Sequence, residues 1–113
     1  MGERTTVMHR FEELIEAEPD SPLYLMDICE KIGVTSRTLR LHCQEHLGMG
    51  PHRYLWLRRM TLARRRLMHT EPDAATATDI AMGYGFGELG RFAVQYHALF
   101  GETPSETLRR PIR

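Results

Sequence analysis

A short sequence unit occurs twice in this chain of 113 residues, at 27–34 and again at 79–86. Each copy reads aspartate, isoleucine, a small residue and, after two variable positions, an apolar residue, a glycine and a second apolar residue. The small residue lets two helices approach closely, and the glycine, Gly33 or Gly85, can take the left-handed conformation of a tight turn between them. The pattern is typical of a helix-turn-helix, and its repetition predicts two such subdomains.

The first two thirds of the chain have helical periodicity outside this unit as well. Apolar spacing predicts an amphipathic helix over residues 5–18, a helix over 36–47 and a long helix over 51–69. Thr35 is the expected N-cap of the 36–47 helix, and Gly48 is its expected left-handed stop. The long helix is expected to bury one stripe, formed by Trp56, Met60, Ala63 and Leu67.

The C-terminal third also has helical periodicity, after a linker at residues 70–75. A short helix is expected to stop at Gly85, and the next helix at Gly101. Residues 103–106 form a capping box that opens a final helix. The apolar stripes are Ile80, Ala81 and Tyr84 in the short helix and Phe92, Tyr96, Leu99 and Phe100 in the next.

No segment alternates with a period of two, so we predict an all-α fold of about seven helices. Its parts are an N-terminal amphipathic helix in residues 1–20, a first helix-turn-helix subdomain in 21–50, a linker helix in 51–69 and a second subdomain in 70–110.

Charge is distributed unevenly, although the formal net charge is zero. Residues 1–30 carry eight acidic side chains and two arginines, whereas residues 36–66 carry eight arginines and one glutamate. Local charge determines what a phosphate backbone meets, so a zero total does not exclude nucleic acid. Arginine also suits bidentate contacts with guanine and phosphate. The structural alternatives for these arginines are a solvated helix face and ion pairs with the acidic first helix.

Composition excludes several classes of protein. The longest apolar runs, at 23–26 and 54–57, have four residues, whereas a membrane span needs about 20 and a signal peptide about 7. Cys29 and Cys43 have no paired spacing, which is typical of a reducing compartment, so we expect a cytoplasmic protein.

Chemistry-bearing motifs are scarce. No nucleophile, base and orienting group recur at useful spacing, and no glycine-rich phosphate loop occurs, so we expect no enzyme and no cofactor. His42, Cys43 and His46 could be taken for metal ligands. Because Cys43 lies on the predicted core stripe, we expect packing there and no metal site.

Further motifs accompany the repeated unit. They are Ser36-Arg37-Thr38-Leu39, residues 45–51 with Tyr54-Leu55, Arg58-Arg59-Met60 with Ala63-Arg64 and Leu67, Asp79-Ile80-Ala81 with Gly85-Phe86, and Phe92 with Tyr96, Phe100-Gly101 and Thr103-Pro104-Ser105. With these motifs, residues 22–110 resemble the C-terminal DNA-binding domain of AraC/XylS-type transcriptional regulators. The resemblance implies two helix-turn-helix subdomains that read successive major-groove segments of double-stranded DNA. A helix over 51–69 would be about 28 Å long, close to the groove repeat of about 34 Å.

The outward face of the 36–47 helix is the first candidate site. Leu39, Cys43 and Leu47 share its inward face. The expected base-contacting residues on the outward face are Ser36, Arg37, Arg40, Leu41 and Gln44. The resemblance places Arg37 and Arg40 where direct base contacts are made, and arginines there predict guanine.

The second candidate face carries Gly90, Ala93, Val94 and His97, of which the first three are the expected base-contacting residues. Small apolar groups can meet a thymine methyl but cannot read a donor pattern, so we expect weaker discrimination here. Residues 64–66 are three successive arginines that point about 100° apart, so at most two can reach DNA. The expected phosphate-contacting residues are Thr38, Arg53, Arg58, Arg65 and Arg91.

The predicted function is a sequence-specific DNA-binding transcriptional regulator, and the alternative is a helical protein-interaction module. The unequal faces predict that one chain covers an asymmetric site. RNA polymerase is a further partner that the resemblance implies. Such regulators usually carry an effector or dimerisation domain as well, which we expect to be missing from this chain.

Overall fold

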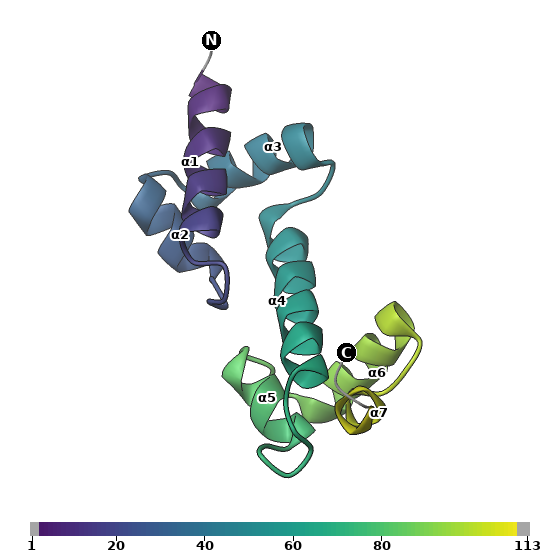
Figure 1. Cartoon of the computed structure of the whole chain (residues 1–113). Coiled ribbons are helices and arrows are strands. Elements are labelled where there is room, and N and C mark those ends of the chain that lie inside the picture. Colours follow the sequence, from purple (N-terminus) through teal and green to yellow (C-terminus); the bar gives the residue numbers. More distant parts are fainter. Residues whose placement is uncertain (1–2, 111–113) are drawn as a thin grey trace. The chain divides into compact units, whose positions relative to one another are not determined.

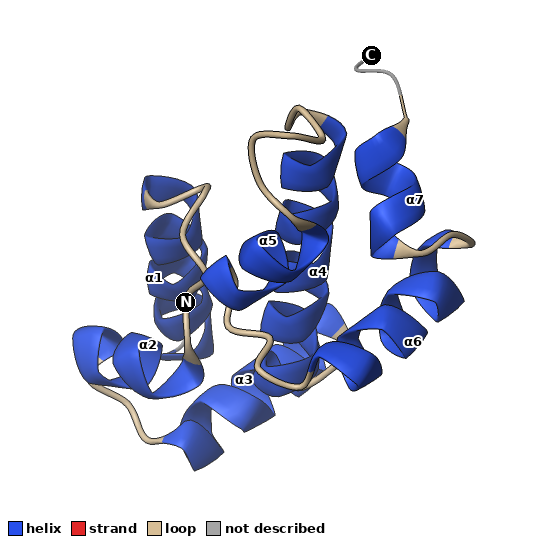
Figure 2. Ribbon diagram, turned by 90° about the horizontal axis from the view of Figure 1, so that it is seen from below, coloured by secondary structure: helices blue, strands red, loops and turns tan. Residues whose placement is uncertain are grey.

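The computed structural model describes residues 3–110, with side chains from residue 6 onward. This part of the chain forms seven helices and no strand, which confirms the predicted fold class (Figures 1 and 2). The helices are α1 (Glu3–Ala17), α2 (Leu25–Ile32), α3 (Ser36–Leu47), α4 (Pro51–Met68), α5 (Ala77–Gly83), α6 (Leu89–Phe100) and α7 (Pro104–Arg109). None of them combines the length and the apolar character that crossing a membrane requires.

The chain separates into two compact units, unit 1 (Met1–Arg58) and unit 2 (Arg59–Arg113). The division falls inside α4, so each unit contains part of this helix. Each unit also has its own group of buried side chains, and each is described by itself below.

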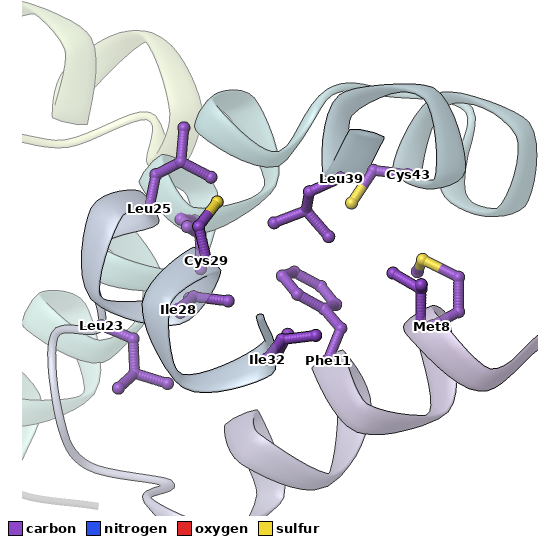
Figure 3. Close-up of a cluster of buried hydrophobic side chains, with 11 residues drawn as sticks. Met8, Phe11, Leu23, Leu25, Ile28, Cys29, Ile32, Leu39 and Cys43 are labelled. Carbon is purple, nitrogen blue, oxygen red and sulfur yellow. The ribbon is translucent and has the colours of Figure 1, made fainter. Parts of the chain in front are cut away.

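Unit 1 is built on three helices, α1, α2 and α3, that pack pairwise on one another. Figure 3 shows their shared core, in which Phe11 of α1 points toward α2 and α3. Phe11, Ile28 and Leu39 are at most 1% exposed, and burial of each such side chain contributes roughly 1.5–3 kcal/mol. The Tyr54 ring of α4 packs on Phe11 with ring centroids 5.7 Å apart. The N-terminal helix therefore forms part of the core of the first unit.

Local signals set the bounds of α3. The Thr35 side chain accepts a hydrogen bond from the Thr38 backbone N–H over 3.1 Å, which caps the helix. Gly33 has a φ of 82° in the turn before α3, and Gly48 has a φ of 75° directly after it. Both predicted glycine turns and the predicted bounds of α3 are confirmed.

Unit 2 is organised around an aromatic row that runs from the turn after α5 along α6. Ring centroids lie 4.7 Å apart for Phe86 and Phe92, 5.6 Å for Phe92 and Tyr96, and 4.7 Å for Tyr96 and Phe100. The helices α5, α6 and α7 pack pairwise around this row. Met60, Ala63 and Leu67 of α4 are also buried in unit 2, as the sequence predicts.

Some helix bounds differ from the predictions. The first helix occupies Glu3–Ala17 in place of 5–18, and the long helix ends at Met68 in place of residue 69. The short helix α5 ends at Gly83, so Tyr84 is its cap and Gly85 follows with a φ of 83°. The backbone N–H groups of Tyr84 and Gly85 donate to the carbonyls three residues before them, at Ala81 and Met82. These shorter hydrogen bonds tighten the last turn, so the α-helix ends before Gly85.

Several predicted core positions are more exposed than expected, and Tyr84 and Phe100 are among those that are half-buried. Leu99 is 38% exposed, because the buried side of α6 is filled by aromatic rings four residues apart. Trp56 and Leu47 are half-buried. The Trp56 ring carries the Arg53 guanidinium on its outer side, at 5.2 Å from the ring centroid.

Candidate nucleic-acid interface

The helix α3 has an inward face with two fully buried residues and an opposite, solvent-facing side. Leu39 and Cys43 are 0% exposed and fix the inward face against the unit 1 core (Figure 3). Four of the five predicted base-contacting residues are exposed, namely Arg37, Arg40, Leu41 and Gln44, and Ser36 is half-buried. The helix therefore presents the predicted residues as one continuous surface, which we call the α3 outer face.

The two arginines of the α3 outer face are not paired with neighbouring side chains in the described part of the chain. Within residues 6–110, Arg37 and Arg40 have no ion-pair or hydrogen-bond partner for their guanidinium groups. The nearby acidic helix α1 instead pairs with His46 at the other end of α3, through Glu12 at 3.2 Å. Two arginines thus remain available to an external acceptor.

The helix α6 repeats this arrangement in unit 2. Phe92 and Tyr96 are buried in its inward face, at the positions that Leu39 and Cys43 occupy in α3. Both helices have twelve residues and end before a left-handed glycine, Gly101 in the case of α6. Its outward side, the α6 outer face, carries Gly90, Ala93, Val94 and His97.

The α6 outer face differs from its counterpart in chemistry. It has no cation at the positions equivalent to Arg37 and Arg40, where Gly90 and Ala93 stand. Ala93 is half-buried, since it lines a hollow with residues of α5 and of the start of α7. Nothing lies within 4 Å of the point where a Cβ at Gly90 would sit, so this position is open space.

A buried polar chain fixes α6 against α7. The Tyr96 hydroxyl donates to Thr107 Oγ1 over 2.8 Å, and the Thr107 hydroxyl donates to the Glu102 carboxylate. Arg110 pairs with the same carboxylate at 2.7 Å. Burial raises the pKa of Tyr96, so its phenol stays protonated and able to donate. The sequence analysis missed this chain of contacts, although a tyrosine on a core stripe needs a buried partner for its hydroxyl.

The predicted phosphate-contacting residues fall into two groups. Arg53, Arg65 and Arg91 are exposed, and Thr38 is half-buried beside the N-cap hydroxyl of Thr35. Arg58 differs, because its guanidinium donates to the backbone carbonyls of Ser21 and Glu18, the second over 2.6 Å. This arginine therefore ties α4 to the loop before α2.

Two further arginines of α4 make contacts within unit 2. The Arg59 guanidinium lies 5.0 Å from the Phe86 ring centroid and donates to the Tyr84 carbonyl over 3.3 Å. The Arg64 guanidinium lies 5.1 Å from the Phe100 ring centroid. Stacking of this kind contributes roughly 0.5–2 kcal/mol. Arg59 and Arg64 thus contribute to the packing of unit 2 through aromatic rings and a carbonyl.

The cysteines belong to the core. Cys43 is 0% exposed, and burial raises the pKa of its thiol to about 11. Burial also raises the pKa of Cys29. Among the residues that the structure describes, no three His, Cys, Asp or Glu side chains are grouped as a metal ion would need. The half-buried His42 lies next to Cys43 in sequence, and its Nδ1 is enclosed without a hydrogen-bond partner.

Comparison with known proteins places this geometry in a family. A family described as a helix-turn-helix domain matches residues 28–110. The chain is 38% identical over 97 residues to a probable thc operon regulatory protein of Rhodococcus erythropolis, a match that covers 86% of this chain and 29% of that protein. It is 34% identical over 101 residues to XylDLEGF operon transcriptional activator 3 of Pseudomonas putida, which covers 89% of this chain and 30% of that protein.

A solved structure from Chromobacterium violaceum agrees with these matches. It is described as a transcriptional regulator with an AraC-type DNA-binding domain, and it superposes with a TM-score of 0.72 at 28% identity over 92% of this chain and 89% of that one. The match spans about 30% of the length of these two curated relatives. The match over residues 28–110 contains the first copy of the repeated unit except Asp27, the whole second copy and both outer faces. The chain therefore belongs to the AraC/XylS-type family of helix-turn-helix transcriptional regulators.

Proposed function

We propose that the chain binds double-stranded DNA in a sequence-dependent manner, with α3 and α6 each placed in a major-groove segment. The observation that carries the proposal is the α3 outer face, where Arg37 and Arg40 have no partner among residues 6–110 and stand opposite the fully buried Leu39 and Cys43. A rigid helix with bidentate donors on its free side is what reading of base edges in the major groove requires. The proposal assigns no catalytic step to the chain.

The α3 outer face supplies the main sequence discrimination. Arg37 and Arg40 donate to the O6 and N7 atoms of guanine, and each such pair contributes about 1–3 kcal/mol of discrimination. Ser36, Leu41 and Gln44 complete the contact surface beside them. The α6 outer face contributes less through Gly90, Ala93 and Val94, since these side chains carry no hydrogen-bond donor or acceptor.

Phosphate contacts hold the helices in place without reading sequence. Arg53, Arg65, Arg91 and Thr38 lie at the surface and fit this role. Sequence analysis predicts Arg58 for the same role, but its internal hydrogen bonds favour a structural one. We therefore leave Arg58 out of the proposed phosphate contacts.

The names of the relatives extend the proposal to transcription. The Pseudomonas putida relatives are described as operon activators, so RNA polymerase is the proposed protein partner of a DNA-bound chain. Because the relatives from Rhodococcus erythropolis and Pseudomonas putida reported above are about three times as long as the chain, an effector or dimerisation domain outside these residues is part of the same proposal.

Selection of binding sites from random DNA at near-physiological salt tests the proposal directly. We expect an enriched, asymmetric motif with guanine in the part that α3 contacts. Arg37→Ala and Arg40→Ala should each remove one guanine preference, whereas Arg109→Ala, an exposed arginine of α7, should leave the motif unchanged. Recovery of no motif would contradict sequence-dependent binding.

The salt dependence of affinity separates DNA binding from a protein-interaction module. Each phosphate contact should contribute about one log unit of affinity per log unit of salt. An Arg53→Ala variant should lower this slope by about one while leaving the selected motif intact. A partner bound through an apolar interface would instead be nearly insensitive to salt.

A further inference from the structure

The two outer faces share one chemical feature. Leu41 on α3 and Val94 on α6 are 58% and 71% exposed, which places them among the most exposed large apolar side chains in the described part of the chain. They occupy the same position in two helices of equal length, each two residues after a buried core residue and two before the next. The equivalence follows from the bounds and buried residues of α3 and α6, and it does not depend on how the two units are placed.

Neighbouring positions of the two faces are chemically different. Arg37 in α3 corresponds to Gly90 in α6, and Arg40 corresponds to Ala93. Gln44 corresponds to His97. A single exposed aliphatic residue is ordinary on a protein surface and needs no explanation. A branched aliphatic residue that recurs at one equivalent position, on faces that differ elsewhere, needs a shared reason.

The proposed function supplies a ligand of matching chemistry. In the major groove, the 5-methyl group of thymine is the apolar feature that the standard bases offer, and aliphatic side chains contact it. The geometry points to Leu41 and Val94 as paired readers of thymine, one in each half of the DNA site. This inference rests on the proposed function and adds to it what the two halves of the site have in common.

The same comparison defines how the halves differ. In the first half of the DNA site, Arg40 reads a guanine beside the thymine. In the second half, Ala93 stands at the equivalent position and has no hydrogen-bond donor, so no guanine is required there. The site therefore contains two thymines in equivalent settings, of which one has a required guanine next to it. Such a site is asymmetric although the two helices share one plan.

Replacement of thymine by uracil removes the methyl group alone and tests the inference. The selected site is synthesised with uracil at each thymine in turn, and the dissociation constant of the whole chain is measured at one salt concentration. We expect uracil at one thymine in each half to weaken binding about fourfold, the equivalent of about 0.8 kcal/mol. Uracil at the other thymines should have no such effect.

Variants assign each methyl group to its reader. With Leu41→Ala, the first-half uracil should no longer weaken binding, while the second-half uracil still should. Val94→Ala should show the opposite pattern, and Met82→Ala, which removes a comparably exposed side chain of α5, should leave both effects in place. Because all three side chains are exposed, thermal unfolding of the variants should match that of the wild type.

Two results would overturn the inference while leaving DNA binding intact. One is a selected motif in which at least one half contains no thymine. The other is an equal uracil effect in the wild type, Leu41→Ala and Val94→Ala, since the methyl groups would then act without these side chains. Failure to select any motif would instead refute the proposed function, so the two failures are distinguishable.

Discussion

Individual arginines in this chain have different roles, although the sequence presents them as one basic region. Arg37 and Arg40 are exposed on α3 and have no partner among the residues whose side chains are described, whereas Arg58 donates to two backbone carbonyls. Arg59 and Arg64 lie over aromatic rings. What separates them is burial and the presence of a carbonyl or ring within reach. A count of basic residues therefore overstates the charge that is available to DNA.

Arg58 should stabilise unit 1 through its two carbonyl contacts. We expect Arg58→Ala to lower the free energy of unfolding by about 1–3 kcal/mol, because hydrogen bonds from a charged donor would be lost. Arg58→Lys should not restore it, since an ammonium cannot span both carbonyls as a guanidinium does. Urea denaturation measures the change, and Arg66→Ala, at an exposed position of the same helix, is the control. If Arg58→Ala left the stability unchanged but lowered the salt dependence of DNA binding, Arg58 would be a phosphate contact and not a structural residue.

Helix ends show which elements can be predicted from sequence. The bounds of α3 follow from adjacent residues, Thr35 and Gly48, so they could be predicted to the residue. The end of α5 depends on a switch to three-residue hydrogen bonds before Gly85, which composition does not reveal. The role of Arg58 depends on carbonyls 37 and 40 residues away, which no local pattern can supply. Contacts across long sequence separations account for most of what the sequence analysis missed.

The capping box of α7 should make stability depend on pH. Hydrogen bonds from Thr103 lower the pKa of Glu106 below its usual value. Because the pKa of Glu106 is lower in the folded state than in the unfolded state, its contribution to stability is fully present at pH values above the unfolded-state pKa. The contribution is lost as the pH falls through the folded-state pKa. The melting temperature of the wild type should therefore exceed that of Glu106→Gln at about pH 6, and the difference should shrink toward about pH 3. A constant difference across this range would contradict the capping role.

The open position at Gly90 allows the α6 outer face to be extended. Gly90→Arg places a guanidinium where α3 has Arg37, with no atom in the way of the new Cβ. We expect the selected motif to gain a guanine in its second half, with discrimination of about 1–3 kcal/mol. Gly83→Arg adds the same charge at an exposed position on α5 and is the control. An equal gain in affinity for all sequences would show that the new arginine contacts only phosphate.

The described part of the chain contains two cores, one in each unit, and the repeated unit provides matched positions for testing both. Ile28 and Ile80 occupy the same place in the two copies of the repeated unit, and both are buried. Both cysteines lie in unit 1, so the rate at which their thiols react reports the opening of that unit alone.

Thiol labelling should distinguish the two cores. Ile28→Val and Ile80→Val should each destabilise their own unit by about 0.5–1.5 kcal/mol. We expect only Ile28→Val to speed the reaction of Cys29 and Cys43 with a thiol reagent. Equal acceleration by both substitutions would mean that the two units open together.

The cationic surface of α3 also determines which covalent modifications can reach it. Acetyl transfer neutralises primary amines, and Lys31, the sole lysine of the sequence, lies on α2 and pairs with Glu18 at 3.6 Å. Arg37 and Arg40 contain no such amine. If α3 binds DNA as proposed, lysine acetylation would therefore leave the contacts of Arg37 and Arg40 unchanged.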